Sequence, residues 1–158
     1  MTHDATPQID FESPANATVL GYLRVADPAN AHTTSPKDVD YMALGTHPDL
    51  VVYLWKLGRS LPCVCACAIG ARSFPLLVHP GSGIIFGLAG GTNTLAFRLP
   101  EPELTEALAE PGFGREFRYP GGPVRASQMG EDWALVPPYG EGNAALCARA
   151  FSHAARPV

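Results

Sequence analysis

The sequence has few charged residues and no long hydrophobic run. Asp, Glu, Lys and Arg make up 16% of its 158 residues, against about a quarter in an average soluble domain. No segment approaches the roughly 20 consecutive apolar residues that cross a bilayer. The opening segment, MTHDATPQIDFESP, contains neither a basic start nor an apolar stretch of signal-peptide length. We therefore expect a chain that does not span a membrane and that works in the cytoplasm.

An excess of positive charge is also missing. The chain has 11 Lys and Arg against 15 Asp and Glu, which gives a net charge of −4 at pH 7. Because nucleic acids are held mainly through their phosphates, this balance disfavours nucleic acid as a partner. We expect a small molecule or another protein instead.

The common motifs of nucleotide binding and hydrolysis are absent as well. The glycine-rich segment GGTNT at residues 90–94 matches neither GxxxxGK[ST] nor GxGxxG, and it stands between two expected strands rather than at the start of a helix. No GxSxG elbow marks a nucleophilic serine. The sequence therefore indicates no catalytic site and no cofactor.

What the chain does contain is glycine and proline at short intervals, 16 of each. From Phe74 to Leu99 they separate three apolar segments, FPLLVH, IIFGLA and TLAFRL, which predict an antiparallel meander. We expect Pro80-Gly81 at the centre of a type II turn, and Gly90-Gly91 in a tight hairpin turn with positive φ.

Helix signals complete the predicted fold. Proline or a capping residue precedes apolar residues at helical spacing in three segments, 48–57, 102–109 and 143–154, and Asn143 is expected to cap the last one. A short helix is also expected at 35–45, whereas the pattern of 17–27 does not distinguish strand from helix.

Together with candidate strands at 115–119 and 132–136, these segments predict a single α+β domain. We place the domain at residues 17–158, with an antiparallel sheet of about five or six strands and helices packed on it. The polar, proline-containing residues 1–16 are expected to form a flexible N-terminal arm.

Three of the four cysteines, Cys63, Cys65 and Cys67, alternate along one expected strand that is apolar on both faces. Such a strand belongs in the middle of a sheet. Successive members would lie about 6–7 Å apart, too far to share one metal ion at about 2.3 Å without bending the strand. We interpret them as small core residues. A metal–thiolate site remains the alternative, and a reactive thiol would need an electropositive neighbour such as Arg72.

Arginines and aromatic residues are interleaved in the second half of the chain. The arginines are Arg72, Arg98, Arg115, Arg118 and Arg125. In the strand 94–99, alternation sends Leu95, Phe97 and Leu99 into the core and leaves Thr94 and Arg98 on the other face.

We hypothesise that this second face, with the turns beside it, binds an anionic or aromatic ligand. The candidate ligand-binding residues are Thr94, Arg98, Arg72, His79 and Asn93.

The order of elements from Phe74 onward resembles that of a known family. The residues that carry the resemblance are FRLP at 97–100, PELTEALAE at 102–110, FRYP at 117–120, WALV at 133–136 and a closing amphipathic helix. This order is similar to that of the small bacterial domains grouped as YjbR or MmcQ-like, together with the TfoX N-terminal domain. About half of the chain is covered; the CVCAC strand and the proline-rich N-terminus have no counterpart.

The resemblance implies a single α+β domain with a curved antiparallel sheet, a largely unassigned biochemical role and an association with DNA binding by analogy. We therefore expect a non-catalytic binding or interaction module. One alternative is a small enzyme or resistance-type protein that uses a pocket between sheet and helices, with His79, Arg98 or a cysteine as its working group. The metal–thiolate protein is the second alternative.

Overall fold

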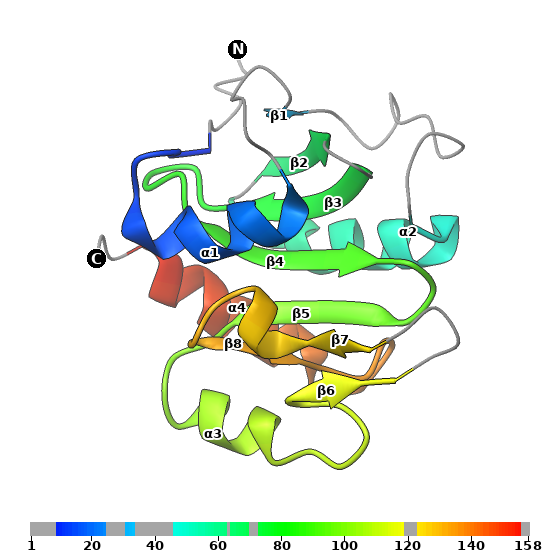
Figure 1. The fold of residues 1–158 in the computed structure, drawn as a ribbon. Coiled ribbons are helices and arrows are strands. Elements are labelled where there is room, and N and C mark those ends of the chain that lie inside the picture. The colour runs from blue at the N-terminus through cyan, green and yellow to red at the C-terminus, as the bar shows by residue number, and fades with distance from the viewer. Residues whose placement is uncertain are drawn as a thin grey trace.

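The fold is known from a computed structural model that describes residues 9–24, 31–33, 46–62, 64–69, 73–118 and 123–155, with the backbone alone for 31–33, 64–69 and 73. The chain forms an α+β domain, as predicted (Figure 1). Its elements are α1 (Pro14–Leu23), β1 (Ala31–Thr33), α2 (Pro48–Arg59), β2 (Val64–Ile69), β3 (Ser73–Val78), β4 (Ile85–Gly90), β5 (Thr94–Arg98), α3 (Glu103–Leu108), β6 (Glu116–Phe117), β7 (Val124–Arg125), the 3₁₀ turn η3 (Ala126–Gln128), β8 (Trp133–Leu135) and α4 (Asn143–Ala154).

Six antiparallel strands form the main sheet in the order β1-β2-β3-β4-β5-β8. The predicted meander is confirmed, because β3, β4 and β5 are consecutive neighbours with pairs such as Gly87 with Phe97. β8 then pairs with β5 and brings Trp133 opposite Arg98. The candidate strand at 115–119 is different: β6 leaves the main sheet and pairs only with β7 in a separate hairpin.

The first turn of the meander differs from the prediction. Positive φ occurs at Gly83 (72°) and not at Gly81, so Pro80-Gly81 does not form a type II turn. The reason is that the His79 ring takes up the backbone N–H groups that follow it, and the Gly83 N–H closes the turn on the His79 carbonyl at 2.9 Å. The second turn behaves as expected, with φ 56° at Gly91.

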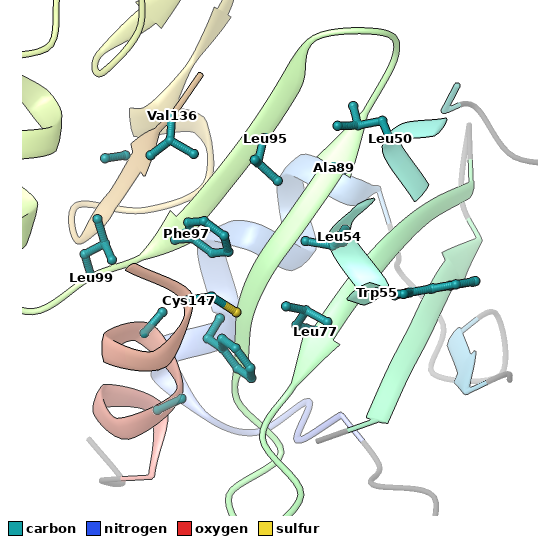
Figure 2. Close-up of a cluster of buried hydrophobic side chains, with 14 of the residues drawn as sticks. Leu50, Leu54, Trp55, Leu77, Ala89, Leu95, Phe97, Leu99, Val136 and Cys147 are labelled. Atoms are coloured by element: carbon teal, nitrogen blue, oxygen red, sulfur yellow. The ribbon is translucent and has the colours of Figure 1, made fainter. Parts of the chain in front are cut away.

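Helices and the hairpin cover both faces of the sheet. On one face α2 and α4 pack over a core that includes Leu54, Leu77, Phe97 and Cys147, as Figure 2 shows. On the other face α1, the β6–β7 hairpin and η3 lie over a second core (Figure 1). Its larger members include Val19, Leu23, Leu76, Leu88, Met129 and Trp133. Every residue of β4 and β5 is therefore buried.

α1 begins at Pro14, inside the segment that we expected to be an arm, and it takes up part of the undecided segment 17–27. Its anchor is Asn16, which is fully buried. The Asn16 Nδ2 donates to the carbonyls of Asp10 (2.8 Å) and Gly83 (2.9 Å), and its Oδ1 accepts the N–H of Ile85 at 2.9 Å. The side chain thus fastens α1 to the turn between β3 and β4. Residues 1–8 lie outside the described residues.

The other predicted helices are present with small changes at their ends. α2, α3 and α4 correspond to the segments 48–57, 102–109 and 143–154, whereas 35–45 lies outside the described residues. Asn143 is the first residue of α4 and not its cap, because Gly142 holds that position. The Asn143 Nδ2 instead donates to the Pro137 carbonyl (2.8 Å) and the Tyr53 hydroxyl (3.1 Å). Among the described helices, none has the length and apolar character needed to cross a membrane.

Candidate functional site

The structure does not bring the predicted ligand-binding residues together. Thr94 and Asn93 lie at the end of β5 next to the Gly91 turn, while Arg98 lies at the opposite end. His79 follows β3 at the Arg98 end of the sheet, with β4 between the two strands. Arg72 lies outside the described residues.

The sheet face that carries Thr94 and Arg98 is covered and not open. The side chain of Arg98 is only 4% exposed, and its Nε lies 2.8 Å from Oδ2 of Asp132. The same carboxylate oxygen lies 3.6 Å from Nε2 of His153. Arg98 is therefore part of an ion-pair cluster at the end of the sheet, where its charge is already occupied.

His79 and Ser82 use their polar atoms to hold a turn against α4. The His79 Nδ1 accepts the backbone N–H groups of Gly81 (3.0 Å) and Ser82 (3.2 Å), and the ring stacks on Phe151 at 4.6 Å. Burial lowers the pKa of His79. The Ser82 hydroxyl donates to the Ala154 carbonyl at 2.6 Å and not to the imidazole. This pair is arranged to position the turn rather than to activate a nucleophile.

The structure places three of the four cysteines, two of them by their backbone alone. Cys65 and Cys67 lie in β2, which pairs on one side with β1 and on the other with β3, so the strand has the interior place that we predicted. Cys63 lies outside the described residues. Cys147 lies on α4, is fully buried and forms no disulfide. Within the described part of the chain, no group of three or more His, Cys, Asp or Glu is placed to hold a metal ion.

Two of the interleaved arginines, Arg118 and Arg125, meet at Glu116 of the β6–β7 hairpin, and Arg115 directly precedes β6. Glu116 accepts hydrogen bonds from Nε of Arg118 at Oε1 and from Nε of Arg125 at Oε2, both at 2.7 Å. These bonds, first from Arg125 and then from Arg118, lower the pKa of Glu116. Arg115 is exposed, and no described carboxylate lies within 4 Å of its guanidinium. The hairpin thus has more positive than negative charge.

Gly114 joins this hairpin to the edge of the sheet. Its N–H donates to the Leu135 carbonyl at 3.0 Å and its carbonyl accepts the Leu135 N–H at 2.8 Å, which ties the chain to the outer edge of β8. A Cβ at this position would lie 2.7 Å from the carbonyl oxygens of both Ala107 and Leu108, so only glycine permits the close approach to α3. The hairpin then returns over the face of β8 that carries Trp133 (Figure 1).

A groove of about 520 Å³, which we call the hairpin groove, lies where the hairpin, η3, α3 and β8 meet. Leu108, Ala126 and Trp133 supply apolar surface to it. The polar lining residues are Arg115, Glu116, Arg125, Ser127 and Glu131. The groove lies on the sheet face of Arg98, whose register partner is Trp133.

The floor of the hairpin groove holds a buried donor. Trp133 is 1% exposed, and none of the described residues accepts a hydrogen bond from its Nε1. The N–H edge of the ring lies against Gly130, because a Cβ there would be 2.9 Å from Cδ1 and 3.5 Å from Nε1 of Trp133. Gly130 also lines the groove. An unpaired buried donor costs about 1–3 kcal/mol, so an acceptor that reaches it from the groove would be bound favourably.

Sequence reasoning pointed to Arg115 and Arg125 but missed Trp133, Gly130 and Ser127. The arginines stand out because they alternate with aromatic residues. From sequence, Trp133 is predicted to be an ordinary core residue of a short strand. That its N–H lacks an acceptor can be found only from the positions of the neighbouring residues in the structure.

Comparisons of the chain with protein-family models, with curated proteins and with solved structures found no match.

Proposed function

We propose that the protein is a non-catalytic small-molecule binding module of the YjbR/TfoX-like kind and that the hairpin groove is its binding site. The N–H groups of Trp55 and Trp133 are both buried without a described acceptor, and the observation that carries the proposal is that Trp133 is the one of the two that lines this groove. An acceptor atom of a ligand would satisfy that donor.

The composition of the groove supports a binding role. Ligand sites are typically concave, mostly apolar and equipped with a few placed polar groups, at volumes of about 300–1,000 Å³. The hairpin groove has this character, with Leu108, Ala126 and Trp133 beneath a polar rim. The family assignment is supported by the order of elements from β3 to α4, which is the order on which the resemblance rests.

The absence of catalysis is part of the proposal. Both carboxylate oxygens of Glu116 accept arginine N–H groups, and those bonds lower its pKa, which suits a fixed counter-ion better than a proton carrier. We also propose a cytoplasmic location, with which a Cys147 that is in no disulfide is compatible.

Nuclear magnetic resonance of the ¹⁵N-labelled protein tests the proposal directly. The chain has two tryptophans, so its spectrum contains two indole N–H signals. They report on opposite faces of the sheet, because Trp55 belongs to α2 and lies in the first core, whereas Trp133 lies in the second core beneath the hairpin. The variant Trp55→Phe assigns the two signals.

We expect members of a library of one- and two-ring aromatic fragments to shift the Trp133 indole signal and the backbone amides of Ser127 and Gly130. The Trp55 signal should stay in place. Fragments that shift only residues around His79, or a library without any fragment that shifts Trp133, would overturn the proposal.

A further inference from the structure

We infer that the ligand of the hairpin groove is a monoanionic aromatic acid, held with its carboxylate on Arg115 and its ring on the apolar floor. The inference rests on the proposed function and adds the chemical class of the ligand. It is drawn from the charges of the groove and from the shape of its lining.

The positive charge at the groove is available to a ligand. Arg115 is exposed and has no carboxylate partner among the described residues. Arg125 uses its Nε on Glu116, which leaves the terminal amino groups of its guanidinium as donors. Arginine guanidinium groups bind carboxylates through two parallel hydrogen bonds, and such bonds are among the strongest polar contacts in proteins. The rim therefore suits an anion.

The negative charges of the groove limit that anion to a single charge. Glu116 and Glu131 line the same groove as the two arginines. A phosphate monoester carries close to two negative charges at neutral pH and would be repelled by both carboxylates. A carboxylate has one charge and a planar shape that matches one guanidinium.

The floor determines the remainder of the ligand. Leu108, Ala126 and Trp133 offer apolar contact, and the groove volume of about 520 Å³ accommodates one or two fused rings. Gly130 lines the groove, has no side chain and lies against the Cδ1 and Nε1 edge of Trp133. An oxygen or nitrogen on the ring of the ligand would satisfy the Trp133 N–H, which has no described acceptor. A flat ring with one acidic group would contact the apolar floor with the ring and bind an arginine of the rim with the carboxylate.

Three naphthalene probes test the inference: 2-naphthoate, the uncharged 2-naphthamide and 2-naphthyl phosphate. Dissociation constants are measured at pH 7 from the shift of the Trp133 indole signal. We expect naphthoate to bind at least about tenfold more tightly than either of the other probes, the difference that one charge-assisted contact supplies.

Two arginine variants identify the contact. Arg115→Gln should weaken naphthoate about tenfold and leave naphthamide unchanged. The control is Arg59→Gln, which removes an exposed arginine at the end of α2, on the opposite face of the sheet, and should change neither affinity.

The outcomes separate the two proposals. Equal affinity for naphthoate and naphthamide, or an Arg115→Gln variant that binds naphthoate normally, would overturn the acid assignment and leave the binding function standing. Tighter binding of naphthyl phosphate would overturn the restriction to a single charge. Failure of every probe and every library fragment to shift Trp133 would remove the proposed function itself.

Discussion

Gly130 shapes the hairpin groove through the side chain that it lacks. Its φ of 151° is one that residues with a Cβ rarely adopt, and an added methyl group would lie 2.9 Å from the Trp133 ring. We expect Gly130→Ala to lower the free energy of unfolding by about 1–3 kcal/mol. Chemical denaturation measures the change.

The matched control is Gly21→Ala. Gly21 lies inside α1, where an added Cβ meets no atom within 4 Å. This variant should raise the free energy of unfolding by about 0.5–1 kcal/mol, because alanine loses less backbone entropy in a helix. A Gly130→Ala variant whose free energy of unfolding is not lowered would show that Gly130 does not pack closely against the Trp133 ring.

The His79 side chain links stability to pH. Burial lowers its pKa from 6.5, so the unfolded chain takes up a proton before the folded one does as the pH falls. The stabilisation is complete above pH 6.5 and is lost as the pH falls through the lower, folded pKa. Protonation of Nδ1 also breaks the bonds from the N–H groups of Gly81 and Ser82. Thermal melts between pH 5 and pH 8 should show a decreasing melting temperature below about pH 6.5.

His79→Asn isolates this contribution. An asparagine Oδ1 can accept the N–H two residues later, as in an Asx turn, but it does not titrate. The variant should keep the turn and flatten the decrease in melting temperature at low pH. A variant that retains the full pH dependence would show that groups other than His79 cause it.

At the scale of elements, one side chain, Asn16, makes the hydrogen bonds that join α1 to the turn between β3 and β4, beside the apolar packing of Val19 and Leu23. Asn16→Ala would leave buried backbone groups of Gly83 and Ile85 without their partner. Each such group costs about 1–3 kcal/mol, so the variant should be strongly destabilised in chemical denaturation. Asn93→Ala is the control, because exposed Asn93 bonds, among the described residues, the neighbouring Thr92 hydroxyl, and its loss should change stability little. Similar effects of the two variants would contradict the anchoring role.

The elements that sequence predicts best are those whose signals are local. Turn glycines and strand alternation between Phe74 and Leu99 are sufficient for the meander, and the spacing of Leu50 and Leu54 is sufficient for α2. The position of α1 cannot be predicted in this way, because the bonds of Asn16 to Gly83 and Ile85 join residues more than sixty positions apart. The separate hairpin also cannot be predicted from local signals, because β6 and β7 have two residues each, too few to show an alternating pattern.

At the scale of the whole molecule, the helices and the hairpin that cover the two faces of the sheet determine which residues are accessible to a ligand. Alternation along β5 correctly separates Phe97 from Arg98, but it cannot show that the Arg98 side is covered as well. That cover comes from α1 and from the hairpin, which is seated by Gly114 on β8. The hairpin groove is therefore a product of tertiary contacts, and only its arginines are visible in the sequence.

The two hydrogen bonds between Gly114 and Leu135 also affect whether two copies of the protein can pair through β8. An outer strand with unpaired backbone groups is a template for strand pairing between molecules. The outward N–H and carbonyl of Leu135 are already used by Gly114, so β8 cannot accept a strand from another copy unless the hairpin first lifts. The contact that shapes a groove thereby also protects the sheet from growing at this edge.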